Sequence, residues 1–564
     1  MVPPKMRNMN TQFQTSSVNR SSYRKRYKQI LSVFARHGFD LTMDKFQQKH
    51  RFFQSRKLKN AETSTGLTPA VHLRLALEEL GPTFIKLGQI LTTRPDLLAP
   101  EYIQELSKLQ DEVPPAPWEA IRAVITEELG DEPEHKFAKI DLLPLAAASL
   151  GEVHAAVLNN GDEVVVKVQR PNIQTVIETD LAILKDLAAL AQRTEWGEQN
   201  QPAEIAEPFA VSLLNELDYC REGRSADRFR TNFTGDETIH IPIVYWDYST
   251  RRVLVMERLT GMKVDDLPAL DKAGYDRKKL ALNSVSIISK EVLQYGFYHA
   301  DPHAGNMVVM SGGVIGLMDF GMMGELSKRE HQSLTRLLIC ASDLDAEDMV
   351  NELIRLSVTG SGVIRARLVS DLDQLLQEYA GKTLKEFNFQ ELMTEFTTLI
   401  TRHHMSLSAK WWMLIKTVVM MEGLGQQLDP GFDWYSVAKP IAQQMKWQML
   451  VPNADWGKAI LRQGKDWGEF LTQLPRASRQ LMDKIEYDQP FDFQLRDLEK
   501  MVSELGRLIN RLSLSIIVAA LVVGLSVLIA TAANGSPLKI LIAIGFLGVL
   551  VLSIWLIVSM VRGR

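Results

Sequence analysis

The chain has 564 residues, and at roughly 150 residues per domain this length predicts three to four domains, or one large domain with additions. A formal net charge of −4 excludes the strongly basic surface of nucleic-acid-binding proteins, so we expect no nucleic acid partner. Two cysteines, Cys220 and Cys340, are too few for a disulfide framework or a cysteine-based zinc site.

The N-terminal segment, residues 1–67, is basic. Eight Lys or Arg residues precede the first acidic residue, Asp40, and they are not followed by the apolar stretch of a secretory signal. This composition is typical of an organellar transit peptide, of a basic arm on anionic lipid, or of a solvated tail. The sequence does not choose among the three.

Residues 68–135 are predicted to form a helical extension made of short pieces. Their apolar residues follow helical spacing, and Pro82, Pro95 and Pro100 are expected to separate one piece from the next. A proline-rich run at 114–117 ends the helical pattern.

Residues 136–262 are predicted to form a small β-rich lobe with inserted helices. An Asn-Asn-Gly-Asp turn at 159–162 precedes a run of valines, which indicates a hairpin. Helical spacing returns at about 172–230, and strands are expected near Val244 and at 253–256. A large, mostly helical lobe is predicted after this one.

The helical lobe covers residues 263–450 and a helical linker covers 451–511. The last segment, 512–564, contains two uncharged apolar stretches, 513–533 and 540–561. A helix of about 20 apolar residues spans a bilayer, so we expect a transmembrane hairpin rather than a pair of buried core helices.

The charges beside the two stretches predict the orientation of this hairpin. Arginines lie outside both stretches, whereas the connecting turn carries only Lys539. By the positive-inside rule, the bulk of the chain is cytoplasmic, with a bacterial inner membrane as the first choice and an organellar membrane as the alternative. Ala520 and Gly524 have a small-xxx-small spacing, which makes a homodimer through the hairpin possible.

Five polar residues occur in an order that phosphoryl transfer requires. Lys167 follows three valines on a predicted strand, Glu222 lies on a later helix, and Asp301 and Asn306 have the spacing of a kinase catalytic loop. Asp319 opens an Asp-Phe-Gly sequence 18 residues after Asp301, and the apolar run 314–318 before it predicts a strand. We expect Lys167 to hold phosphates and Glu222 to orient that lysine. Asp301 would accept a proton or orient the nucleophile, and Asn306 and Asp319 would bind Mg²⁺.

Histidines at 299 and 303 could instead suggest a metal site. Pro302 disfavours a helix there, and the chain has no His-Glu-x-x-His sequence, so we expect His303 to be structural.

The chain departs from protein kinases at three positions. The loop before the lysine strand consists of Ala146, Ala147, Ala148 and Ser149, with alanines where glycines are expected. Ala300 occupies the usual arginine position, and no Ala-Pro-Glu follows Asp-Phe-Gly. We therefore expect altered nucleotide binding and no docking segment for a peptide substrate.

These departures, together with Lys86-Leu87-Gly88-Gln89 and Glu216-Leu217-Asp218, resemble the UbiB family of atypical, aarF-domain-containing kinase-like proteins. The resemblance covers roughly residues 68–430. It implies an α+β, bilobal protein-kinase-like fold whose N-terminal extension covers the protein-substrate site. Lys86 and Gln89 would share a helix face that points at the nucleotide pocket, near Glu216 and Asp218.

The resemblance also implies that Met256 and Glu257 form the hinge that meets adenine, and that the cofactors are ATP and Mg²⁺. The function it implies is a membrane-anchored ATPase that supports ubiquinone-type isoprenoid quinone biosynthesis by handling lipophilic precursors. Expected partners are the bilayer, isoprenoid lipid intermediates and other quinone-biosynthesis enzymes. A protein kinase acting in trans, and a non-enzymatic lipid-binding scaffold with a nucleotide switch, are the alternatives.

Overall fold

The computed structural model describes residues 20–39, 67–92, 94, 97–109, 113–194, 197, 202–359, 364–380, 389–403, 405–432 and 548. All of these except Gly548 lie in one compact unit, Met1–Val451. The predicted linker and, apart from Gly548, the predicted transmembrane hairpin lie outside the described residues. Within the ranges just given, no helix has both the length and the apolar character needed to cross a membrane.

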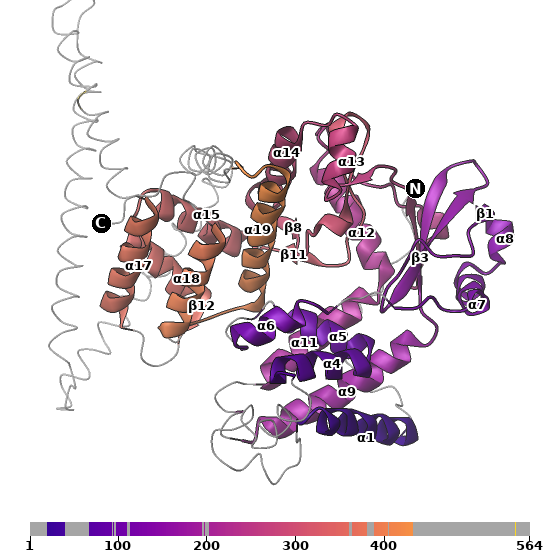
Figure 1. Cartoon of the computed structure of the whole chain (residues 1–564), viewed down its shortest axis with the longest axis horizontal. Helices are drawn as coiled ribbons and strands as arrows, with labels where there is room; N and C mark the ends of the chain where they lie inside the picture. Colours follow the sequence, from indigo (N-terminus) through magenta and orange to yellow (C-terminus); the bar gives the residue numbers. More distant parts are fainter. Residues whose placement is uncertain are drawn as a thin grey trace, which may run out of the picture. The chain divides into compact units, whose positions relative to one another are not determined.

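The helical extension consists of short helices interrupted at prolines, as the sequence predicts. Its helices are α1 (Arg20–Arg36), α4 (Pro69–Leu80), α5 (Pro82–Thr92) and α6 (Pro100–Leu106). A proline occupies the first helical position of α4, α5 and α6, where its missing N–H costs nothing. Gly88 allows close packing, because a Cβ at this position would lie 2.3 Å from Leu109 Cδ1. Figure 1 shows these helices gathered with α9 (Ile173–Ala191) and α11 (Pro202–Glu216).

The β-rich lobe is a five-stranded sheet in the order β1-β3-β4-β6, with β2 paired to β3. Its strands are β1 (Phe137–Ile140), β2 (Ala146–Ala147), β3 (Gly151–Leu158), β4 (Glu163–Gln169) and β6 (Val253–Glu257). Strand alternation buries Val164, Val166 and Val168 on one face of β4 and leaves Lys167 on the other.

One helix assigned to the extension by sequence packs elsewhere. Residues 118–135 were grouped with the extension, but α7 (Trp118–Leu129) covers the valine face of the sheet, and α8 (Pro133–Lys136) leads directly into β1. The apolar face of α7 is buried against the β4 valines, which explains why α7 belongs to this lobe.

After α9 and α11, a third helix lies between β4 and β6 in the chain. It is α12 (Tyr219–Asn232).

The C-terminal lobe combines helices with short strands. Its helices are α13 (Leu267–Lys272), α14 (Arg277–Ser289), the π-helix at Lys290–Tyr295, α15 (Lys328–Ser342), α16 (Ala346–Leu356), α17 (Arg365–Ala380), α18 (Phe389–Arg402) and α19 (Ala409–Leu428). Short 3-10 turns lie at Ala304–Asn306 and Ser311–Gly313 in this lobe and at Trp246–Tyr248 in the β-rich lobe.

The C-terminal lobe has more strands than the sequence predicts. A four-stranded sheet has the order β5-β10-β9-β7, and β11 pairs with β8 while β12 pairs with β13. These strands are β5 (Ile239–His240), β7 (Met262–Lys263), β8 (Phe297–His299), β9 (Met307–Val309), β10 (Ile315–Leu317), β11 (Met323–Glu325), β12 (Ser357–Thr359) and β13 (Met405–Leu407). Strands of two or three residues are too short to show alternation, and only β10 was expected from its apolar run before Asp319.

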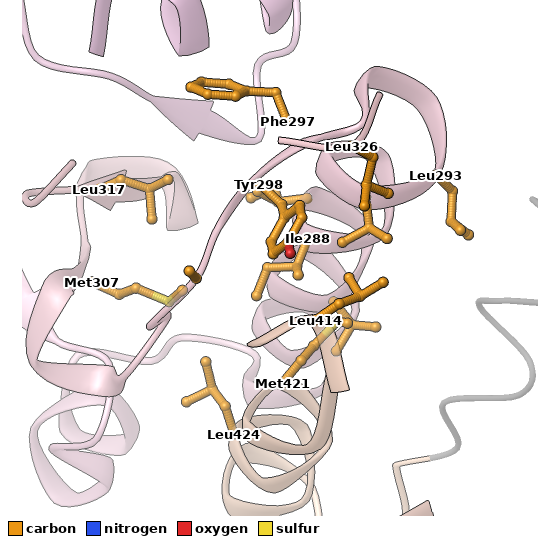
Figure 2. Close-up of a cluster of buried hydrophobic side chains, with 14 of the residues drawn as sticks. Ile288, Leu293, Phe297, Tyr298, Met307, Leu317, Leu326, Leu414, Met421 and Leu424 are labelled. Atoms are coloured by element: carbon orange, nitrogen blue, oxygen red, sulfur yellow. The ribbon is translucent and has the colours of Figure 1, made fainter. Parts of the chain in front are cut away.

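The core of this lobe joins β8, α14 and α19. Figure 2 shows Ile288 of α14, Tyr298 of β8 and the α19 side chains Leu414 and Met421 in one buried cluster. Tyr298 is fully buried, so the strand that leads into the predicted catalytic loop is held by both helices.

An ion pair fastens α1 to the rest of the extension. The Arg26 guanidinium donates to both carboxylate oxygens of Asp180 on α9, at 2.7 and 2.8 Å, and to the Leu80 carbonyl at 2.6 Å. The Thr83 hydroxyl also donates to Asp180, at 2.8 Å, and the Asp180 side chain is fully buried. A buried carboxylate with this many donors depends on all of them.

We predict that Asp180→Asn lowers the free energy of unfolding by about 3 kcal/mol, because it breaks this buried pair and leaves Arg26 without its charge partner. The measurements are thermal unfolding in detergent micelles and protease cleavage within residues 20–36. Glu178→Gln on the same helix is the control, since the Glu178 carboxylate accepts from Gln174 of α9 itself, at 2.8 Å. Equal behaviour of the two variants would show that the pair does not hold α1.

Candidate functional site

The structure brings Lys167, Glu222 and Asp319 together. The Lys167 ammonium donates to both carboxylate oxygens of Glu222 at 2.8 Å and lies 3.4 Å from Asp319 Oδ1. Lys167 is on β4, Glu222 is on the first turn of α12, and Asp319 follows β10. Protein kinases need a lysine–glutamate pair and an aspartate of this kind in place at the same time.

One cation between two carboxylates determines the charges of the group. Burial alone would lower the pKa of Lys167, but the carboxylates of Asp319 and Glu222 raise this pKa well above its ordinary value. Burial raises the pKa of Glu222 to about 7. Although burial acts against it, Lys167 holds the pKa of Asp319 well below its usual range. Asp319 therefore remains a carboxylate anion.

Phe320, the residue after Asp319, packs against α12. It is 1% exposed, and its ring lies 5.6 Å from the ring of Phe229. Arg228, beside Phe229 on α12, pairs with Glu325 of β11 at 2.9 Å and stacks 3.9 Å from the ring centre of Phe297. These contacts hold α12 in the position that presents Glu222 to Lys167.

The predicted catalytic loop runs from β8 to β9. Asp301 Oδ1 accepts from the ammonium of Lys416 on α19 at 2.8 Å, and the Asp301 N–H donates to His299 Nδ1 at 3.1 Å. Asn306 ends a short 3-10 turn, and its carbonyl accepts from Met318 N at 2.9 Å. This backbone bond joins the Asn306 loop to the residue immediately before Asp319.

His299 and Glu291 support this loop through hydrogen bonds. His299 is buried, and its Nε2 lies 3.0 Å from the Asp319 carbonyl oxygen. The His299 N–H donates to Glu291 Oε2 at 2.9 Å, and burial raises the pKa of Glu291 to about 8. Glu291 lies in the π-helix, a local distortion that often occurs at functional sites. His303 lies 3.9 Å from Asp301 and is half-exposed.

The alanine-rich loop is a turn between β2 and β3. Ala146 and Ala147 pair with Val153 and Glu152, and the Ala148 N–H donates to the Gly151 carbonyl at 2.8 Å. None of residues 145–151, all of which the structure describes, has a positive φ. The alanines therefore form this turn without the left-handed backbone that glycine would allow.

A buried side-chain cluster ties this loop to the chain that leaves the extension. The Arg170 guanidinium donates to the Ala148 carbonyl at 2.9 Å and to the Pro114 carbonyl at 2.7 Å. Glu152, which is fully buried, lies 3.3 Å from Arg170 and accepts from the Ala116 N–H. Ser149 is also buried, at 1% exposure.

Lys86 reaches the Glu216-Leu217-Asp218 sequence, but Gln89 does not. The Lys86 ammonium lies 2.7 Å from Glu216 Oε1, whereas the Gln89 amide donates to the Leu109 carbonyl at 3.5 Å, within the extension. Asp218 caps α12, because its Oδ1 accepts from Cys220 N at 3.1 Å. Of these residues, Lys86 and Glu216 form the contact between the extension and the lobe.

Met256 and Glu257 end strand β6. Met256 is 3% exposed in the core. The Glu257 carboxylate lies 2.9 Å from His240 Nε2 and accepts from Ile243 N at 3.1 Å, and its own N–H donates to the Ile243 carbonyl at 2.8 Å. An adenine contact at Glu257 would therefore have to use its carbonyl group.

Sequence reasoning missed three residues of this site: Tyr219, Glu291 and Lys416. The Tyr219 ring centre lies 5.2 Å from the Lys167 ammonium, a cation–π distance, and a Cβ on Gly151 would lie 2.3 Å from the Tyr219 hydroxyl oxygen. Lys416 is a lone charge in an otherwise apolar stretch between Lys410 and Glu422, and that isolation was the available signal.

The oxygen atoms of Asn306 and Asp319 are of the type that Mg²⁺ takes. In the described residues, no group of three or more His, Cys, Asp or Glu side chains is placed to hold a metal alone. Mg²⁺ in phosphoryl-transfer sites takes one or two protein carboxylates and completes its shell with phosphates and water, so this donor set fits it. When bound, Mg²⁺ would neutralise phosphate charge.

Comparison with known proteins places three family matches along the chain. The ABC1 atypical kinase-like domain matches residues 108–353, the UbiB helical domain 372–433, and the ABC1/UbiB kinase-like C-terminal domain 496–562.

Two curated relatives are similar over most of their length. An uncharacterised protein of Synechocystis sp. is 37% identical over 418 residues, which cover 73% of this chain and 72% of that protein. A Clostridium pasteurianum protein from the hydrogenase 1 5′ region is 30% identical, covering 95% of this chain and 98% of that one. A Mycobacterium tuberculosis protein solved with erythromycin is 21% identical, covers 66% of this chain and 95% of its own, and has a TM-score of 0.44.

We predict that Glu291→Gln removes part of the pH dependence of stability. The pKa of Glu291 is about 8 in the folded chain and about 4.3 in an unfolded one, so wild type binds one more proton when folded between these values. The stability that this extra proton gives the folded chain is fully present below the pKa of the unfolded chain. It is lost as pH rises, at about 1 kcal/mol per pH unit, until about pH 8. Gln keeps an acceptor for His299 but does not titrate.

The test is thermal unfolding of both proteins from pH 5 to pH 9. The variant is expected to gain stability over wild type as pH rises to 8 and to keep a constant advantage above it. A difference that does not change with pH would contradict the assignment of this proton to Glu291.

Proposed function

The chain belongs to the ABC1/UbiB family of atypical kinase-like proteins, and from this premise we propose that it binds and hydrolyses ATP. The proposal includes a membrane anchor and a role in isoprenoid quinone biosynthesis. The observation that carries it is the Lys167–Glu222–Asp319 group beside the Asp301 loop.

Each side chain has a role in this proposal. Lys167 holds phosphate oxygens, and Glu222 keeps its ammonium oriented. Asn306 and Asp319 bind Mg²⁺ through oxygen atoms. Asp301 accepts the proton of the attacking water, whose oxygen forms the new bond to the terminal phosphorus while the bond to the ADP oxygen breaks. The alanine-rich loop, with Ala146, Ala147, Ala148 and Ser149, and the strand end at Met256 and Glu257 would surround the nucleotide.

The short chain after Asp319 favours transfer of the phosphoryl group to water over transfer to a protein. Strand β11 begins two residues after Gly321, and α15 begins at Lys328 after a capping box of Ser327 and Glu330. Residues 322–327 are therefore the whole segment in which a protein kinase would place its peptide-docking loop.

The two uncharged stretches at 513–533 and 540–561 support the membrane part of the proposal. A cytoplasmic ATPase body fixed to a bilayer can act on molecules that do not leave the bilayer, and isoprenoid quinone precursors belong to this class. The C-terminal family match, residues 496–562, includes both stretches.

We predict that the purified full-length chain in liposomes with anionic lipid releases phosphate from Mg-ATP. Asp319→Asn removes the carboxylate charge that binds Mg²⁺, so it should lower kcat by about 100-fold or more. Asp247→Asn is the matched control, since Asp247 is exposed on the β-rich lobe. An equal rate for wild type and Asp319→Asn would mean that the chain is not an ATPase at this site.

A second prediction separates an enzyme from a lipid-binding scaffold. In a quinone-deficient strain that the wild-type gene rescues, Asp301→Asn should fail to restore quinone, because the proton acceptor is lost while the fold is kept. Quinone is measured by extraction and chromatography, with the membrane level of the variant as the control. Full rescue would favour the scaffold, and labelled phosphate on a membrane protein would favour a kinase acting in trans.

A further inference from the structure

The catalytic carboxylate takes its strongest positive partner from outside its own loop. Residues 299–310 contain no Lys or Arg. Within this loop, the imidazole of His303 lies near the Asp301 carboxylate, with its Nε2 at 3.9 Å from Asp301 Oδ2. Lys416 is closer, with its ammonium 2.8 Å from Asp301 Oδ1, although it lies 115 residues further along the chain.

Lys416 is carried by a helix that the core holds firmly. Its neighbour Thr417 is fully buried, and the Thr417 hydroxyl donates to the His299 carbonyl at 3.3 Å. Leu414 and Met421, on the buried side of α19, pack in the cluster that contains Tyr298 (Figure 2). Two successive residues of α19 therefore contact the catalytic loop, one at the His299 backbone and one at the Asp301 carboxylate.

We propose that Lys416 is a catalytic-site cation supplied by the helical domain, which positions the Asp301 carboxylate and adds positive charge beside it. A proton acceptor must be held in one orientation, and a preorganised cation stabilises the negative charge that develops on a phosphoryl group. The position of α19 thereby becomes part of the active site. The inference rests on the ATPase activity proposed above.

A purely structural lysine would have the contacts of Lys410, which lies on the same helix. Lys410 pairs with Glu330 of α15 at 3.2 Å, and its carbonyl accepts from the Tyr298 hydroxyl at 3.3 Å. Both lysines are partly exposed, at 32% for Lys416 and 41% for Lys410. Lys410 pairs with Glu330, whereas Lys416 pairs with Asp301. Lys410→Met therefore controls for the loss of one ion pair on α19.

The experiment measures kcat and KM for phosphate release from Mg-ATP by the full chain in liposomes. Lys416→Met should lower kcat by about 100-fold, and Lys416→Arg, which keeps the charge, should restore most of it. Lys410→Met should leave kcat unchanged. Wild-type kcat in Lys416→Met, or equal losses in the Met and Arg variants, would overturn the inference.

A second readout does not need turnover. Lys416→Met leaves Asp301 as an uncompensated anion, so ATP affinity should fall by about threefold to fivefold. The double variant Lys416→Met/Asp301→Asn is neutral again at this pair and should regain wild-type affinity. Additive losses in the double variant would overturn the inference. A wild type without phosphate release would contradict the proposed function, whereas the affinity cycle would still decide the role of Lys416.

Discussion

A single ammonium group, that of Lys167, lies between the buried carboxylate of Glu222 and the partly exposed carboxylate of Asp319. The three groups come from a strand, a helix and a loop that lie up to 152 residues apart. Two carboxylates on either side of one site would repel each other without a cation, so each of the elements that carry them has to stay in place. The packing of Phe320 on Phe229 meets this requirement.

Two further parts of the chain contact the elements around this centre. In the extension, Lys86 pairs with Glu216, which lies two residues before Asp218, the cap of the helix that carries Glu222. In the C-terminal lobe, α19 contacts the predicted catalytic loop at His299 and Asp301. Helices that come before and after the kinase-like sheet in the chain thus support the elements around this centre.

The local pattern of the sequence predicted the parts that depend on near neighbours. The valine run and its turn identified the hairpin that carries Lys167, and prolines marked the starts of α5 and α6. The pairing of Lys86 with Glu216 was also within reach once both motifs were recognised. The packing of α7 was not, because an amphipathic helix has an apolar face whichever lobe it covers. Lys416 was missed for a related reason, since spacing along the chain says nothing about a partner 115 residues away.

The short chain between Gly321 and α15 has a consequence for regulation. In protein kinases, a long activation loop is phosphorylated and then folds back to order the site. Here six residues, three of them in β11, cover this distance before the capping box fixes the start of α15. Residues 322–327 therefore offer no comparable loop for phosphorylation to order, and the packing of Phe320 on Phe229 holds the site in place without one.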